Sequence, residues 1–431
     1  MPSTLIESSR LNAPTLHRLA NGLTIVAEQM PIEAVNLSLW TGIGSAIETD
    51  DINGIAHFLE HMIFKGTARL QSGEFEQQIE QRGAVTNAAT SQDYTHYYIT
   101  TAPQDFASLA PLQIEVVLNA AIPDYAFERE RLVVLEEIRR SEDNPRRRTF
   151  CRSMEAAFDR LPYRRSVLGP ASVIEQLKPQ QMRDFHATWY RPQSITASVV
   201  GNLPVEQLID IVANGFATAQ STPYQSTTSY SPELPDCSPE APFTTIDRHD
   251  YSDSSLQQAR LVMMWRVPGT ADLSQTYALD ILSSILGGGR TARLVRELRE
   301  ERGLVTNIAV SNMTYMRQGL FYISAQLPIE NLTVTEEAIA HHIHSLQTEP
   351  ITDAEIGRVR TLVANRYIFG NETPGDRASL YGYYQAVLGD LTLALDYPTR
   401  IQSLDQADLQ AAAKQYLSPE AYKVVVLKPL A

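Results

Sequence analysis

Cysteine is nearly absent from this sequence of 431 residues, which contains only Cys151 and Cys237. Two cysteines so far apart in the chain form neither a disulfide framework nor a zinc knuckle, and they fit a reducing compartment. Long apolar runs are also absent, so we expect no segment that spans a membrane. The first ten residues lack the basic and apolar regions of a secretory signal. From these absences we predict a cytoplasmic protein.

Basic residues are too few to balance the acidic ones, with 36 Lys and Arg against 50 Asp and Glu and a net charge of −14. A surface of this charge repels nucleic acid, so we expect no nucleic-acid partner. It would not hinder a neutral or basic peptide, although charge alone favours the simpler explanation that the acidity confers solubility. The hydrophobic content of 43% is typical of a soluble globular protein, and the length predicts two or more domains.

The most informative feature present is the motif His-x-x-Glu-His, formed by His57, Glu60 and His61. The motif lies in a predicted helix, and residues that can cap or end this helix flank it: Asp50, Asp51, Asn53 and Gly66. Because His57 and His61 are one helical turn apart, both imidazoles can bind one metal ion. Glu60 lies beside them, where it can take a proton from a water that the ion activates.

Two buried structural histidines are the alternative interpretation of this motif. Apolar residues surround the predicted helix almost completely: Ile55, Phe58, Leu59, Met62, Ile63 and Phe64. Such a helix is expected to be buried, where two imidazoles and a carboxylate are costly without a partner. The motif therefore favours a metal site over a pair of core histidines.

A third metal ligand is expected from another element, because zinc hydrolases usually combine three protein ligands with one water. A second helix is predicted at about residues 127–143. Glu130 and Glu137 are seven residues apart and share one face of this helix, whereas Glu136 points about 100° away. The same composition is also typical of a solvent-exposed acidic helix with arginine partners. The helix pattern alone favours the solvent-exposed acidic helix, with a metal ligand as the alternative.

The motif, followed by Glu130 and Glu137 in a Leu-Glu-Glu-Ile segment, resembles the inverted-zincin (pitrilysin-type, M16) metallopeptidases. This family includes the mitochondrial processing peptidase and its bacterial relatives. The flanking segments Gly54–Thr67 and Asn87–Thr90 are also close to the family pattern, and the resemblance covers essentially the whole chain.

The resemblance implies that His57, His61 and Glu137 bind Zn²⁺ and that Glu60 is the general base. It implies that Glu130 orients one of the ligands. The activity expected is zinc-dependent cleavage of unstructured peptides or protein termini inside a clamshell chamber. An exposed strand is expected to bind the peptide as an additional strand through Asn87, Ala88, Ala89 and Thr90.

A segment rich in Ser, Thr and Pro predicts a linker at residues 221–245. It separates residues 1–220 from residues 246–431, and these halves resemble a diverged repeat. Ile174–Val200 aligns with Ile401–Leu427 without a gap, and the Thr-Ala-Arg-Leu run at 67–70 recurs at 291–294. The second alignment places Ile281, Ser284 and Ile285 opposite the motif residues, so only the first half is expected to bind metal.

Within each half, predicted strands and helices do not alternate strictly. We therefore expect an α+β fold of two homologous domains, each a largely antiparallel sheet packed with helices. The family resemblance implies the same LuxS/M16-like metallohydrolase architecture, with a catalytic first domain and a second domain without metal.

A second M16-type subunit is implied, because known family members enclose substrate between two such two-domain units. The second half of family members often carries an Arg and a Tyr, seven apart, that hold the substrate carbonyl near the zinc of the opposite unit. Arg299 matches, but Thr306 occupies the Tyr position. We therefore expect a heterodimer, with a homodimer as the alternative if Tyr315 or another hydroxyl substitutes. A competing function is a non-catalytic scaffold, although such relatives tend to lose the metal residues, which are all present here.

Overall fold

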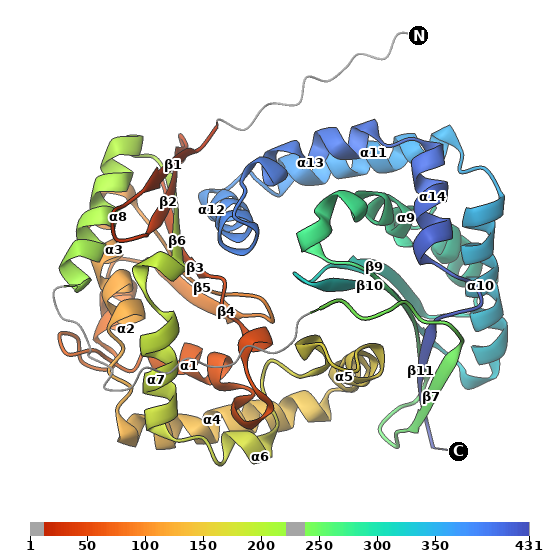
Figure 1. Cartoon of the computed structure of the whole chain (residues 1–431), viewed down its shortest axis with the longest axis horizontal. Helices are drawn as coiled ribbons and strands as arrows, with labels where there is room; N and C mark the ends of the chain where they lie inside the picture. Colours follow the sequence, from red (N-terminus) through yellow and green to blue (C-terminus); the bar gives the residue numbers. More distant parts are fainter. Residues whose placement is uncertain (1–12, 221–237, 431) are drawn as a thin grey trace, which may run out of the picture. The chain divides into compact units, whose positions relative to one another are not determined.

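The computed structural model describes residues 13–220 and 238–430, which form two compact units (Figure 1). Unit 1 consists of the described residues of Met1–Ile138, Ser166–Pro235 and Arg366–Leu395. Unit 2 consists of those of Arg139–Arg165, Asp236–Asn365 and Asp396–Ala431. Each unit is built on one β-sheet packed with helices, as the predicted α+β class requires.

The sheet of unit 1 has six strands in the order β1-β2-β6-β3-β5-β4. Only β2 and β6 are parallel, and the other neighbours are antiparallel. The strands are β1 (Thr15–Arg18), β2 (Thr24–Gln29), β3 (Val35–Thr41), β4 (Val85–Thr90), β5 (Thr95–Thr101) and β6 (Ile195–Gly201). Strand β4 pairs only with β5, so it is one edge of this sheet.

One face of the unit 1 sheet is covered by the main apolar core. Phe58, Phe106 and Phe216 are fully buried in it, and they lie on three different helices. Strand alternation explains the arrangement, because every second residue of β3 and β5 faces these helices. The helices of this part of the chain are α1 (Ile55–Ile63), α2 (Glu74–Gln81), α3 (Pro103–Leu118), α4 (Asp124–Asp143), α6 (Ala171–Ile174), α7 (Pro179–Trp189) and α8 (Val205–Gln220).

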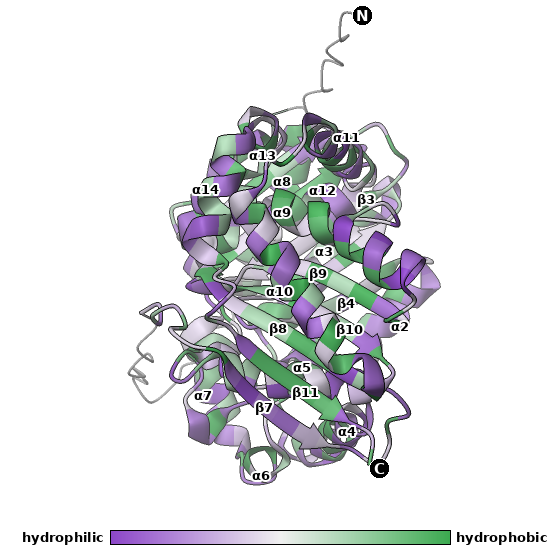
Figure 2. Cartoon of the chain, turned by 90° about the vertical axis from the view of Figure 1, so that its right-hand side faces the viewer, coloured by the Kyte–Doolittle hydropathy of each residue, from purple (hydrophilic) through white to green (hydrophobic). Residues whose placement is uncertain are grey.

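The sheet of unit 2 has five strands in the order β7-β11-β8-β10-β9, with only β7 and β11 parallel. The strands are β7 (Asp247–Ser252), β8 (Ala259–Pro268), β9 (Asn307–Met313), β10 (Gln318–Leu327) and β11 (Lys423–Lys428). Figure 2 shows that β11 is largely hydrophobic and the edge strand β7 largely hydrophilic. The helices of the second half are α9 (Tyr277–Gly287), α10 (Leu332–Thr348), α11 (Asp353–Phe369), α12 (Pro374–Tyr383), α13 (Thr392–Ser403) and α14 (Gln406–Tyr416).

The aligned segments of the two halves form the same elements. Helices α7 and α14 are both 11 residues long, and they begin at aligned positions, Pro179 and Gln406. Each of these helices precedes the strand that pairs in parallel within its sheet, β6 after α7 and β11 after α14. This agreement supports the duplication inferred from the sequence.

Each half also contributes one helix to the sheet of the other unit. Helix α5 (Pro145–Ala157) packs on β8 and β11, and α12 packs on β3 and β6. Both helices begin with Pro, and the arginine three residues later pairs with an acid of its unit: Arg148 with Asp253 and Arg377 with Glu28. The compact units therefore differ from the two sequence halves by this exchange of equivalent helices.

The linker expected at 221–245 lies mostly outside the described residues, and residues 238–246 form neither helix nor strand. No described helix combines the length and apolar character that a membrane span requires. The cytoplasmic compartment stays a prediction.

Candidate metal centre

Helix α1 carries the motif, and its N-terminus is capped by a residue that the sequence pattern did not indicate. The predicted capping by Asp50, Asp51 and Asn53 is wrong. The buried carboxylate of Glu48 instead accepts hydrogen bonds from the backbone N–H groups of Gly54 and Ala56, each 2.8 Å long. The Asn53 side chain donates to the same carboxylate at 2.8 Å. The helix ends at Ile63, and Gly66 follows with a positive φ of 102°.

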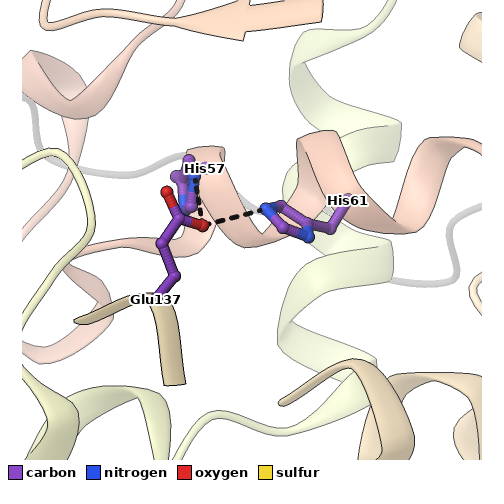
Figure 3. A group of neighbouring side chains, drawn as sticks. All are labelled: His57, His61 and Glu137. Atoms are coloured by element: carbon purple, nitrogen blue, oxygen red, sulfur yellow. Dashed lines mark ion pairs between the residues drawn. The ribbon is translucent and has the colours of Figure 1, made fainter. Parts of the chain in front are cut away.

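His57 and His61 of α1 point toward Glu137 of α4 (Figure 3). The Nε2 atoms of His57 and His61 lie 3.6 Å and 3.5 Å from Oε2 of Glu137. Ligand atoms about 2.0–2.1 Å from a tetrahedral zinc ion are roughly 3.3–3.4 Å apart, so the spacing fits zinc. Among the described residues, this is the only group of three or more such side chains that could hold a metal ion.

Glu60 is held beside this group by the edge strand of the sheet. The hydroxyl of Thr90, at the end of β4, donates a 2.5 Å hydrogen bond to Oε2 of Glu60. Burial raises the pKa of Glu60, and the hydrogen bond from Thr90 offsets this only in part. A carboxylate with a raised pKa is suited to proton transfer near neutral pH. Thr90 was predicted to bind substrate, and the structure gives its side chain this further contact.

Glu130 lies on the same face of α4 and contacts the other ring nitrogen of His61. Its Oε1 atom is 3.1 Å from Nδ1 of His61, and its Oε2 atom is 2.8 Å from Nζ of Lys65. Lys65 was not predicted from the sequence, and it lies just beyond the end of α1, where helical spacing from His61 does not place it. Burial acts to raise the pKa of Glu130, but the hydrogen bonds with Lys65 and His61 lower it below its ordinary value.

The pKa values of the two histidines shift in opposite directions. Burial, reinforced by the charge of His61, lowers the pKa of His57 to about 4, although Glu137 acts in the opposite direction. Burial also acts to lower the pKa of His61, but hydrogen bonds with Glu137 and Glu130 outweigh it, and the pKa is raised. His57 is therefore neutral near pH 7 and offers a nitrogen lone pair, as a metal ligand must.

The expected substrate strand is β4, at the edge of the unit 1 sheet. Its residues alternate, with Asn87 and Ala89 exposed and Ala88 and Thr90 only partly exposed on the other face. The side-chain oxygen of Asn87 accepts the backbone N–H of Ala88 at 2.9 Å. A peptide that pairs with β4 therefore has to replace this local hydrogen bond if it uses the same N–H group.

The remaining predicted site residues belong to unit 2. Arg299 lies in a π-helical segment, Val295–Glu301, and its guanidinium donates to Glu300 at 2.9 Å and 2.7 Å. The Thr306 hydroxyl donates to the backbone oxygen of Gln326 at 3.0 Å, and Tyr315 stacks on Tyr163. A role for Arg299 in substrate binding stays a prediction.

The two positions of unit 2 that were aligned with the motif histidines are apolar. Ile281 and Ile285 of α9 are fully buried in the core of that unit. Buried isoleucines have no atom that can bind a metal ion, so this helix fills the core where α1 presents its histidines.

Comparison with known proteins agrees with this fold. A family described as Insulinase (Peptidase family M16) matches residues 24–171, and one described as Peptidase M16 inactive domain matches residues 176–363. The chain belongs to peptidase family M16.

Its relatives in that family include proteins named as zinc proteases. The chain is 26% identical over 417 residues to the zinc protease PqqE of Helicobacter pylori, covering 95% of this chain and 92% of that protein. It is 27% identical over 426 residues to an uncharacterized zinc protease of Mycobacterium tuberculosis, covering 97% of this chain and 93% of that protein. The crystal structure of a protease from Helicobacter pylori has a TM-score of 0.88 and 25% identity, with 96% of this chain and 99% of that chain covered.

Proposed function

We propose that this chain is a zinc-dependent endopeptidase that cleaves unstructured peptides or flexible protein termini. The observation that carries the proposal is the convergence of His57, His61 and Glu137 at zinc spacing, with Glu60 on the same helix. A purely structural zinc site would not require Glu60 or the Thr90 hydroxyl that holds it.

In this mechanism His57, His61 and Glu137 hold the zinc ion. When bound, the ion lowers the pKa of a water and polarises the scissile carbonyl. Glu60 accepts the proton of the attacking water and transfers it to the leaving amine. Thr90 fixes the direction of the Glu60 carboxylate. Glu130, itself held by Lys65, fixes the ring of His61.

Substrate binding is assigned to the free edge of β4. An extended peptide added there forms main-chain hydrogen bonds, which demand little of its sequence. Substrates are therefore expected to be unfolded segments, because a folded protein has no free strand to offer.

The proposed assembly includes a second M16-type subunit. Arg299 has no tyrosine seven residues later, and Thr306 is too short to replace a phenol at the same backbone position. The Thr306 hydroxyl is also bonded within its own sheet. A different partner chain could supply the complete Arg/Tyr pair that stabilises the developing oxyanion.

The test is cleavage of a quenched fluorescent, unstructured peptide by the purified, zinc-loaded chain, before and after zinc is removed by a chelator. In the active assembly, whether the chain alone or with its partner supplied, we expect cleavage that chelation abolishes and zinc restores. If the chain alone is inactive, Thr306→Tyr is the next variant, because position 306 is exposed and can accept the larger side chain. Activity gained by T306Y supports the requirement for the Arg/Tyr pair. Activity of the wild-type chain alone refutes the need for a different partner, and cleavage that survives complete zinc removal refutes the peptidase mechanism.

Glu48 provides a separate prediction about the metal centre. Its carboxylate offsets the partial positive charge, about +0.5, at the N-terminus of α1, next to His57. Glu48→Gln is expected to lower the free energy of unfolding by about 1–3 kcal/mol and the zinc affinity by about tenfold. Calorimetric unfolding and competition with a chromophoric chelator measure the two effects.

Glu240→Gln is the matched control for Glu48→Gln. The buried Glu240 carboxylate also accepts three backbone N–H groups, those of Asp159, Arg160 and Leu161, at 2.8–3.0 Å, but in unit 2. The Glu240→Gln variant should be less stable than the wild type but should keep its zinc affinity. Equal zinc affinities of the two variants would show that Glu48 supports the fold alone.

A further inference from the structure

Helix α5 runs along strand β8 in unit 2, and one hydrogen bond fixes its C-terminal end. Nε of Arg266 donates to the backbone oxygen of Ala157 at 2.8 Å. Arg260 lies six residues earlier on β8, about 20 Å along a strand. Arg146 lies eleven residues earlier on α5, about 16 Å along a helix. These similar lengths bring the N-terminal end of α5 to Arg260, and the ring contact of Phe150 on α5 with Tyr322 on the neighbouring strand β10 supports this path.

The strand register places a second arginine of α5 at the same end of the sheet. Arg260 pairs with Leu427 of β11, and the backbone oxygen of the next residue, Lys428, accepts the backbone N–H of Asp253 at 2.8 Å. Asp253 binds Arg148, with 2.6 Å between Nη2 and Oδ2. Arg146 and Arg148 therefore lie near Arg260, and the nearby carboxylate of Asp253 is already paired with Arg148.

Arg146 and Arg260 have no acid of their own within the described residues. Neither guanidinium takes part in a hydrogen bond or an ion pair there, and the buried Nε of Arg260 lacks an acceptor. Burial, followed by repulsion from Arg146 and Arg148, lowers the pKa of Arg260. A partly buried guanidinium among like charges is costly unless a ligand completes the site.

Arg266, on the same face of β8, shows what a satisfied arginine looks like on this strand. It donates to the backbone oxygens of Ala157 and Ala241, each at 2.8 Å, and pairs with Asp159 and Glu240 at 2.9 Å and 2.6 Å. Water can accept the hydrogen bonds of an exposed arginine such as Arg146. It cannot do so for the Nε atom of Arg260, which is buried.

We propose that Arg146 and Arg260 form a carboxylate-binding site on the unit 2 sheet, and that its ligand is an acidic residue of a peptide. A guanidinium presents parallel N–H donors that match the two oxygens of a carboxylate. The local excess of positive charge contrasts with the net charge of −14 and would attract an acidic segment selectively. The conclusion that this site binds substrates rests on the proposed function. The conclusion that it binds acidic peptides does not, because binding does not require cleavage.

The test is fluorescence anisotropy with the zinc-loaded Glu60→Gln chain and labelled, unstructured peptides. One amidated peptide contains two adjacent Asp residues, its twin contains Asn instead, and a third has no acidic side chain but a free C-terminal carboxylate. We expect the Asp peptide to bind about tenfold more tightly than its Asn twin. If the third peptide shows the preference instead, the carboxylate site stands and its ligand is a chain end.

Arg260→Gln and Arg146→Gln should each reduce the preference for carboxylate to about twofold or less. Arg152→Gln is the matched control, because Arg152 lies on the same helix but pairs with Glu155 at 2.9 Å, and it should leave the preference unchanged. Should Arg260→Gln fail to fold, the exposed Arg146 still tests the site. Equal binding of all three peptides, or a preference that survives both arginine variants, overturns the inference.

Failure of this inference and failure of the proposed function are distinguishable. A chain that prefers the Asp peptide but cleaves nothing, with zinc bound and a partner supplied, retains the carboxylate site and loses the peptidase assignment. A chain that cleaves peptides without any such preference retains the peptidase assignment alone.

Discussion

Glu60→Gln is expected to lower kcat for peptide cleavage by about a hundred- to ten-thousandfold, the range that a general acid–base residue contributes. Glutamine keeps the size of the side chain, and its carbonyl oxygen can still accept the hydrogen bond from Thr90. It cannot take a proton from water at neutral pH. Zinc content should stay at one ion per chain, because Glu60 does not belong to the group of three potential ligands.

The measurement combines initial rates on a quenched fluorescent peptide with zinc analysis and thermal unfolding of both proteins. A variant that keeps more than about a tenth of the wild-type kcat would show that Glu60 is not the general base. A variant that loses its zinc would show that Glu60 is a ligand instead. The scaffold alternative predicts a zinc-loaded wild type without turnover, in which this substitution changes nothing.

Glu137→Gln is expected to lower the zinc affinity by more than about a hundredfold and to abolish cleavage, since even changes around the ligands cost about 10–100-fold. Glu137 supplies the negative charge among the three potential ligands, and its Oε2 atom lies 3.6 Å and 3.5 Å from the two imidazoles. An amide oxygen is a neutral and weaker ligand. The Glu137 side chain is 44% exposed, so the substitution should not disturb the core.

Glu136→Gln is the matched control, because it removes the same charge from the adjacent position, about 100° around the helix. It should leave zinc affinity within about twofold of the wild type. Competition with a chromophoric chelator measures all three proteins. If the Glu136 variant loses zinc affinity and the Glu137 variant does not, the assignment of Glu137 as the third ligand is wrong.

The contributions of sequence and structure separate clearly at α1. His57 and His61 could be paired from sequence, because a spacing of four residues on a helix fixes their relation before any tertiary contact forms. The helix cap was predicted wrongly from the nearby Asp50, Asp51 and Asn53. Glu48 reaches Gly54 and Ala56 across a turn whose path no periodic pattern encodes.

The same distinction applies to the carboxylates of α4. Their spacing put Glu130 and Glu137 on one face, but by itself it favoured a solvent-exposed acidic helix. The family resemblance selected the metal interpretation, and the structure then placed both side chains against the histidines of α1. Lys65 and the Thr90 hydroxyl were not assigned their contacts, because each depends on the packing of separate elements.

The sequence by itself determined the local features: the His-x-x-Glu-His motif, the helices that carry it and Glu137, the duplication and the mainly antiparallel α+β class. These follow from periodicity and spacing along one chain, which local geometry dictates. Only the tertiary structure decided that α5 and α12 each pack on the sheet of the other half, and that three arginines meet at one end of β8. Such contacts join residues more than a hundred positions apart, as Arg148 and Asp253 show. They depend on how whole surfaces pack, which short-range sequence patterns do not specify.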